Sequence, residues 1–293
     1  MLSTKKARRG AIAAACVFAG VVALSPDSPA TAAPLGAAAA HHTSPTSSAK
    51  PTIVLVHGAW ADASSWNPVI TRLQNAGYTV YAPPNPLRGV ASDAQTIADF
   101  LSTIPGPVIL VGHSYGGFVI TNAATQSPNV KGLVYDDAYI PDQGETVFQI
   151  NAAQPGSCVA ADPTSFLNFV PYPGGPAGDV DAYLKVAPNG TYQGFDNCFA
   201  NGVPTAQASL LATGQRPFAV SVGSEPSGVP AWKTLPSWAV VGTQDHVIPP
   251  AELLAMAKRA GSQIVQVPAG HLSLLTQPGV VANTIMKAAS SVG

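Results

Sequence analysis

The sequence alternates short apolar runs with longer amphipathic stretches from Pro51 onward, and this pattern constrains the fold more than any other feature. Each apolar run has the length and the β-branched residues of a buried strand, and each following stretch has helical periodicity. Strands that alternate with helices pair in parallel through right-handed crossovers. The pattern therefore predicts an α/β fold with a mostly parallel sheet flanked by helices.

The pattern has two parts that together form one predicted core, 51–140 and 236–293. In the first part the strand-like runs are TIVLVH, YTVYAP, PVILVG and KGLVYDD, with helices near 64–75, 93–103 and after Tyr115. In the second part they are SWAVVG and QIVQVP, with helices at 250–260 and about 273–289.

Between these parts, residues 141–235 break the pattern. They contain glycine and proline throughout, with some short helical pieces. The segment leaves the core at the carboxyl end of a predicted strand, which is where ligands bind in open α/β sheets. We therefore expect 141–235 to form a cap over a site rather than an independent second domain.

A single serine between glycines, in VILVGHSYGGFVITNAA, follows one of the predicted strands and precedes a predicted helix. A strand-to-helix turn of this kind holds its central residue in a strained conformation and needs small neighbours, which Gly112, Gly116 and Gly117 provide. The turn makes Ser114 a candidate nucleophile.

A nucleophilic serine needs a base, and the base needs an acid that orients it. Of the six histidines, His271 is the best candidate because it follows the strand-like run QIVQVP and so lies at the same sheet edge as Ser114. Asp245 follows the run SWAVVG and precedes His271, so it is the preferred acid. Asp136 and Asp137 close another strand and remain rival acids.

The negative charge that develops during attack on a carbonyl needs hydrogen-bond donors. In this kind of site the donors are two backbone N–H groups, one directly after the nucleophile and one in the loop after the first strand. These positions are Tyr115 and, in the sequence HGAW, Ala59.

The N-terminus has the pattern of a secretory signal peptide at 1–33, which predicts a secreted protein. Basic residues precede the apolar run 11–24, and the small residues Ala30-Thr31-Ala32 follow it. The run is shorter than the ~20 residues of a membrane-spanning helix, so we expect no membrane anchor after cleavage. Residues 34–50 have no periodicity and are predicted to be a flexible lead-in.

Cleavage would leave Cys158 and Cys198 as the last two cysteines of an exported chain. Two cysteines in an exported protein most simply form one disulfide. The alternative is a pair of separate buried thiols.

Composition and motifs argue against several function classes. Only 10% of the residues are charged, and removal of the signal leaves a mildly acidic chain, which does not favour nucleic-acid binding. The spacing of histidines and cysteines does not match a metal site, and the glycines near Ser114 lack the lysine of a phosphate-binding loop. We therefore expect no metal and no cofactor.

Five motifs in this order, HGAWADASSW, GHSYGG, LVYDDAYIPDQGE, VVGTQDHVIPP and PAGHLSLLTQP, resemble the α/β-hydrolase superfamily. More narrowly, they look like the branch that contains plant methyl-ester esterases, hydroxynitrile lyases and bacterial pyrethroid-type carboxylesterases. The resemblance covers nearly all of 52–287 except the interior of the cap. Longer hydrolases of this superfamily have extra N-terminal strands, for which this chain lacks room. The resemblance therefore implies a minimal sheet of about six parallel strands.

The resemblance implies a cofactor-free serine esterase that acts on a small-molecule ester. Ser114 would be the nucleophile, His271 the base and Asp245 the acid, with an acyl-enzyme intermediate. One alternative is a hydroxynitrile-type lyase with the same triad, although neither Lys185 nor Lys233 has a convincing position for it. The other is a non-catalytic secreted binding protein on a hydrolase scaffold.

Overall fold

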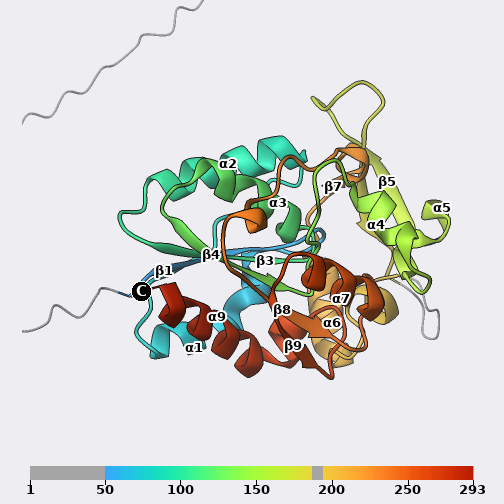
Figure 1. The fold of residues 1–293 in the computed structure, drawn as a ribbon. Coiled ribbons are helices and arrows are strands. Elements are labelled where there is room, and N and C mark those ends of the chain that lie inside the picture. Colours follow the sequence, from blue (N-terminus) through green and yellow to red (C-terminus); the bar gives the residue numbers. More distant parts are fainter. Residues whose placement is uncertain (1–49, 187–193, 293) are drawn as a thin grey trace, which may run out of the picture. The chain divides into compact units, whose positions relative to one another are not determined.

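The computed structural model describes residues 50–186 and 194–292, so the predicted signal peptide and residues 34–49 of the lead-in lie outside the described residues. In the described part, six parallel strands form the main sheet in the order β2-β1-β3-β4-β8-β9 (Figure 1). Their bounds are Thr52–Val56 (β1), Val80–Tyr81 (β2), Val108–His113 (β3), Val130–Asp136 (β4), Ser237–Gly242 (β8) and Gln263–Val267 (β9). The predicted α/β fold is confirmed.

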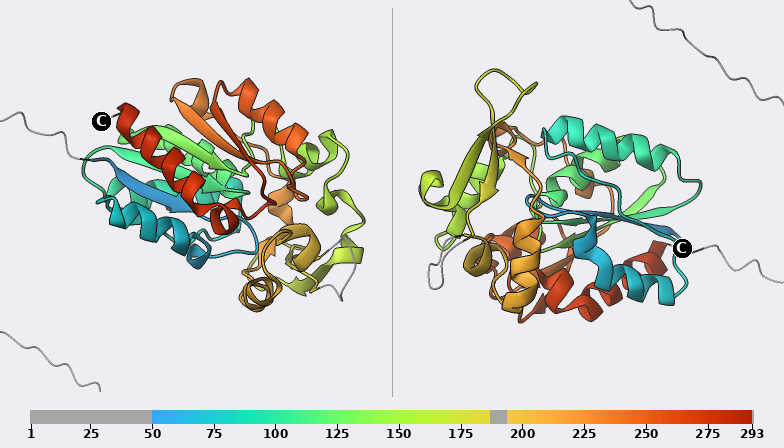
Figure 2. Two further views of the ribbon diagram at one scale, coloured as in Figure 1. Left: turned by 90° about the horizontal axis from the view of Figure 1, so that it is seen from below. Right: turned by 180° about the vertical axis from the view of Figure 1, so that it is seen from behind.

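Helices cover both faces of this sheet because both faces of its central strands are apolar; every residue of β3 and β8 is buried. Figures 1 and 2 show α1 (Asn67–Asn75) and α9 (Pro278–Val292) on one face, with α2 (Val90–Ser102) and α3 (Gly116–Ala123) on the other. No helix in the described part of the chain combines the length and the apolarity that a membrane crossing requires.

The strand order reverses between β1 and β3, and this reversal creates the place for a site. The chain runs from β1 outward to β2 and then returns to β3, beyond which β4, β8 and β9 follow. In the register of the sheet, Val56 lies opposite Gly112, and Gly112 lies opposite Tyr135. The loops after β1, β3 and β4 therefore emerge side by side, as expected at a topological switch point.

Two predicted elements differ in extent from the structure. The run YTVYAP yields only the two-residue strand β2, at the edge of the sheet, where it pairs with a single neighbour. The helix predicted over 273–289 is divided into α8 (Ser273–Thr276) and α9. The division lies at Pro278, which has no N–H group for a continuing helix but suits the first position of a new one.

The segment 141–235, which we call the cap segment, connects β4 to β8, and most of its described residues gather at the carboxyl end of the main sheet (Figure 2). Besides the expected short helices it contains a three-stranded antiparallel sheet, which the glycine- and proline-rich sequence did not predict. The helices and strands of this segment are Val147–Ala153 (α4), Pro163–Phe166 (α5), Leu167–Pro171 (β5), Val180–Leu184 (β6), Thr205–Thr213 (α6) and Phe218–Ala219 (β7). Outside the segment, after β8, α7 spans Pro250–Arg259. A π-helix spans Phe195–Phe199.

Candidate active site

Ser114 occupies the sharp turn between β3 and α3, with a backbone φ of 53° in the left-handed region that favours glycine. Its neighbours must be small for this turn to form. A Cβ atom on Gly112 would lie 2.6 Å from the carbonyl oxygen of Gly116, and one on Gly116 would lie 2.5 Å from that of Val56. The turn therefore presents the Ser114 hydroxyl above the end of the sheet, as the sequence pattern predicts.

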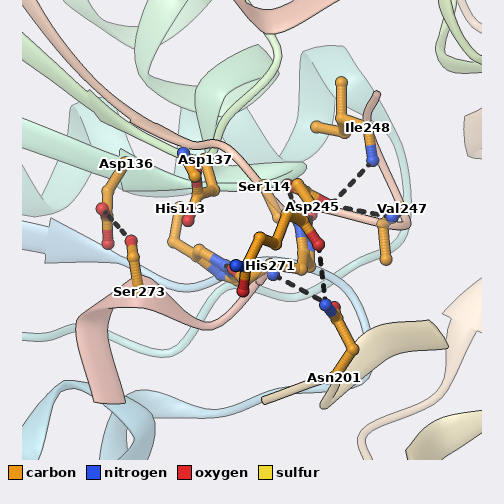
Figure 3. A network of polar contacts seen from close by, with 12 residues as sticks. His113, Ser114, Asp136, Asp137, Asn201, Asp245, Val247, Ile248, His271 and Ser273 are labelled. Carbon is orange, nitrogen blue, oxygen red and sulfur yellow. Dashed lines mark hydrogen bonds and ion pairs between the residues drawn. The ribbon is translucent and has the colours of Figure 1, made fainter. Parts of the chain in front are cut away.

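The structure brings Ser114, His271 and Asp245 together in one chain of hydrogen bonds (Figure 3). The Nε2 atom of His271 lies 2.9 Å from Oγ of Ser114, and Nδ1 lies 2.8 Å from Oδ2 of Asp245. All three side chains are buried. A carboxylate on Nδ1 favours the tautomer that leaves Nε2 free to accept a proton from the serine.

Asp245 is fixed by its own loop. Its second oxygen, Oδ1, accepts hydrogen bonds from the backbone N–H groups of Val247 at 2.7 Å and Ile248 at 3.0 Å. Hydrogen bonds to both oxygens stabilise a carboxylate in a buried position and fix the direction in which it faces. The loop after β8 thus presents a single carboxylate oxygen to the histidine.

The rival acids, Asp136 and Asp137, lie nearby but are bound to other groups. Oδ1 of Asp136 accepts a hydrogen bond from the Ser273 hydroxyl at 2.6 Å, and Oδ1 of Asp137 accepts one from the N–H of Gly242 at 2.5 Å. Burial raises the pKa of Asp136 to about 7 and raises that of Asp137 well above its usual range, with the nearby Asp245 carboxylate adding to both. Asp245 alone among these three carboxylates contacts His271 in the described structure.

Ala59 and Tyr115, the predicted oxyanion donors, line the same cavity as Ser114. Within the described residues, their backbone N–H groups donate no hydrogen bond, so both are available to a ligand. The loop before Ala59 is held by Asn85, whose backbone N–H donates to Nε2 of His57 at 3.0 Å and whose side chain donates to the His57 carbonyl at 3.0 Å. Burial lowers the pKa of His57 to about 4, which keeps the ring neutral in this role.

Sequence reasoning overlooked two residues that position the histidine. The Nε2–H of His113, directly before Ser114 at the end of β3, donates to the His271 carbonyl at 2.8 Å. From the cap segment, Asn201 accepts from the His271 N–H at 3.4 Å and donates to the Gln244 carbonyl at 2.7 Å. The adjacency of His113 to the serine was the one available signal, whereas no local pattern distinguishes Asn201.

A cavity of about 230 Å³ extends from Ser114 into the cap segment; we call it the site cavity. Its walls come from both the core and the segment 141–235, and they include no charged side chain among the described residues. The aromatic residues that line it are Trp60, Tyr115, Tyr139, Phe148, Phe166, Phe169 and Phe218. A cavity with this lining suits an apolar, uncharged ligand with one polar group near Ser114.

Cys158 and Cys198 lie at disulfide distance, with their Cα atoms 5.8 Å apart. Both belong to the cap segment, and Cys158 also contacts the acid loop, because its backbone N–H donates to the His246 carbonyl at 2.8 Å. Among the described residues there is no group of three or more histidine, cysteine or acidic side chains arranged to hold a metal ion.

Comparison with known proteins agrees with this geometry. The chain is 37% identical to a carbendazim-hydrolysing esterase of a Nocardioides species over 110 residues, a match that covers 33% of this chain and 46% of that esterase. It is 27% identical to a pyrethroid hydrolase of Sphingobium wenxiniae over 251 residues, covering 80% and 85% of the two chains. The crystal structure of polyneuridine aldehyde esterase superimposes with a TM-score of 0.66 at 19% identity, covering 82% of this chain and 99% of that one.

The fold, the serine turn and these matches agree with a family model that spans residues 53–284, most of the chain. The expected superfamily resemblance is thereby confirmed. The chain belongs to the alpha/beta hydrolase family.

Proposed function

We propose that this chain is a secreted serine esterase that cleaves small, uncharged, apolar carboxylic esters. It is a carboxylic ester hydrolase in which Ser114 is the nucleophile, His271 the general base and Asp245 the orienting acid. The observation that carries the proposal is the pair of hydrogen bonds that joins these three buried side chains at 2.9 Å and 2.8 Å.

The reaction follows from this arrangement in two steps. The Ser114 hydroxyl attacks the ester carbonyl while its proton passes to Nε2 of His271, and the negative oxygen of the tetrahedral intermediate accepts hydrogen bonds from the N–H groups of Ala59 and Tyr115. His271 then donates the proton to the departing alcohol, which leaves an acyl group on Ser114. A water molecule, deprotonated by His271, hydrolyses this acyl-enzyme and regenerates the serine.

The site cavity supports the choice of substrate. Its volume of about 230 Å³ and its aromatic lining fit a hydrocarbon or aromatic acyl group. A free carboxylate or an ammonium group would enter without a charged partner, which is costly in an apolar cavity. Two of the relatives, a pyrethroid hydrolase and a carbendazim-hydrolysing esterase, are named for hydrolysis of a small molecule, which supports a small-molecule substrate here.

A hydroxynitrile-type lyase would need a lysine near the site, but the two candidate lysines bind other groups of the cap segment. Lys185 donates to the Thr164 carbonyl at 2.7 Å, and Lys233 forms an ion pair with Asp142 at 2.6 Å. Neither lysine lines the site cavity. Among the described residues the geometry thus favours the esterase over carbon–carbon cleavage.

Hydrolysis of methyl esters of increasing acyl length, followed by acid release, tests this function. We expect turnover that rises with acyl length until the site cavity is full and then falls, and that is lost in Ser114→Ala. Ser102→Ala, which removes an exposed hydroxyl of α2 that does not line the site cavity, should retain full turnover as the matched control. A folded wild-type protein without serine-dependent turnover on any ester would overturn the proposal and favour the lyase or the binding protein.

Secretion is the remaining part of the proposal, and the N-terminal sequence 1–33 supports it. Expression of the full chain in a host that exports proteins should deliver activity to the medium. Mass spectrometry of the exported protein should then find a new N-terminus near Ala32 or Ala33. Retention of residues 1–33 on exported protein would contradict a cleaved signal.

A further inference from the structure

A second cavity, of about 280 Å³, lies next to the site cavity. Its inner end is lined by buried Phe199 and Leu272 with half-buried Trp60, and its outer end by exposed Gln207 with half-buried Asp62 and Leu211. Trp60 lines both cavities. The second cavity therefore begins directly behind the wall of the candidate active site.

The wall consists of the rings of Trp60 and Phe199, which pack edge to face with their centroids 6.0 Å apart. Phe199 also packs against the His271 ring, with a centroid distance of 5.4 Å. These two contacts make the wall one ring thick between His271 and the second cavity. We call Trp60 and Phe199 the aromatic partition.

Both sides of the partition are held in place. The indole N–H of Trp60 donates to the Ala182 carbonyl of β6 at 3.0 Å, and its backbone has a φ of 56°, a strained value for a bulky residue. Phe199 ends the π-helix that contains Cys198, which lies at disulfide distance from Cys158. Phe199 is only 2% exposed, so it does not leave its position without a change in the cap segment.

The chemistry of an ester directs its alcohol toward this partition. The carbonyl oxygen must face the N–H groups of Ala59 and Tyr115, which line the site cavity together with Ser114. The departing alcohol oxygen must lie within hydrogen-bond reach of Nε2 of His271, because that atom protonates it. An alcohol in this position lies beside the His271 ring, against which Phe199 packs, and neither of these two rings lines the site cavity.

We infer that Phe199 determines alcohol specificity: it restricts the enzyme to esters of small alcohols and closes off the second cavity, which would otherwise hold a larger alcohol. This inference rests on the proposed function and adds to it the class of substrate, an ester with an apolar acyl part and a methyl- or ethyl-sized alcohol part. A smaller residue at 199 joins the second cavity to the site.

The test compares methyl butyrate with benzyl butyrate, which share an acyl group and differ only in the alcohol, with acid release measured for both. Wild-type enzyme should favour the methyl ester in kcat/KM, and Phe199→Ala should raise the benzyl-to-methyl ratio about tenfold or more, as expected when a pocket gains room for apolar groups. Phe199→Leu, a milder change, should move the ratio in the same direction if the alanine variant folds poorly.

Two further variants distinguish an opening between the site and the second cavity from a general loss of rigidity in the cap segment. Leu210→Ala alters an exposed side chain that lines the second cavity and, among the described residues, makes no ring contact with the partition, so the ratio should stay at the wild-type value. Leu211→Trp, added to Phe199→Leu, fills the second cavity from its outer end and should reverse the gain.

An unchanged ratio in both Phe199 variants would overturn the inference, as would a wild-type enzyme that cleaves the benzyl ester as well as the methyl ester. In either case serine-dependent hydrolysis would still support the proposed function. Absence of serine-dependent turnover on these two esters and on every methyl ester of the acyl-length series would overturn the proposed function itself, and the inference with it.

Discussion

Asp245 and His271 face each other across 2.8 Å, between Oδ2 of the carboxylate and Nδ1 of the imidazole, although they leave the sheet from different strands. Asp245 follows β8 and His271 follows β9, which are neighbours in the sheet with Gly242 opposite Val267. Two backbone N–H groups hold the other oxygen of the carboxylate. The contact is therefore a consequence of sheet register combined with a short, hydrogen-bonded loop.

This contact predicts a large kinetic effect for Asp245→Asn. An amide in place of the carboxylate can donate to Nδ1 and so favour the tautomer whose Nε2 carries the proton and cannot accept one from Ser114. We expect kcat to fall by up to ~10⁴ while the protein remains folded. Asp136→Asn, a matched change to a neighbouring carboxylate that does not contact His271, should retain most activity. Near wild-type turnover in Asp245→Asn would transfer the acid role to Asp136 or Asp137.

His113 is predicted to act as a positioning residue through its hydrogen bond to the His271 carbonyl. His113→Ala leaves that buried carbonyl without its donor, so the free energy of unfolding should fall by about 1–3 kcal/mol. In addition kcat should fall with little change in KM, because the histidine loop loses its anchor. His113→Gln, whose amide can donate, should recover part of kcat. Equal kcat in the alanine and wild-type enzymes would show that the bond has no positioning role.

The cysteine pair predicts that a reductant lowers the free energy of unfolding. Reduction, or replacement of Cys158 and Cys198 by serine, should lower the free energy of unfolding by roughly 4 kcal/mol, the chain-entropy value for a bridge between residues 40 apart. Urea unfolding with and without reductant measures this difference. Alkylation of both cysteines to the same extent with and without reductant would contradict the disulfide.

Burial of Asp136 predicts that stability depends on pH. Because burial raises its pKa from 3.8 to about 7, the folded protein holds this proton more tightly than the unfolded chain. The stability from protonated Asp136 is therefore fully present below pH 3.8 and is lost as the pH rises through about 7. His57 has the opposite sign, because burial lowers its pKa from 6.5 to about 4, and its contribution is lost only as the pH falls below 6.5.

Urea unfolding between pH 6.5 and about 8 covers the folded-state pKa of Asp136, and a comparison with Asp136→Asn cancels the contribution of His57, which both proteins share. Wild-type stability should fall across this range relative to Asp136→Asn, whose amide does not titrate. Asp99→Asn, at an exposed position of α2, is the control and should parallel the wild type. Parallel curves for wild type and Asp136→Asn would show that Asp136 does not carry the pH dependence.

Much of the architecture follows from local sequence patterns. The β-branched runs and helical periods predicted the parallel sheet because strand and helix formation depend mainly on residues close together in the chain. The turn at Ser114 was predictable for the same reason, since glycines within three residues decide whether it can form. The extent of the edge strand β2 and the antiparallel sheet of the cap segment were harder to predict from the sequence, because the formation of short strands depends on their neighbours more than on their own residues.

The sequence by itself thus determined the strand order along the chain, the serine turn and a short set of candidate bases and acids. The tertiary structure decided which candidates meet, because Ser114 and His271 are 157 positions apart and only the sheet order brings them within 2.9 Å. It also decided that His113, Asn201 and Phe199 contact His271, which depends on long-range packing. Contacts of this kind arise from the closure of the fold, and local sequence carries no record of them.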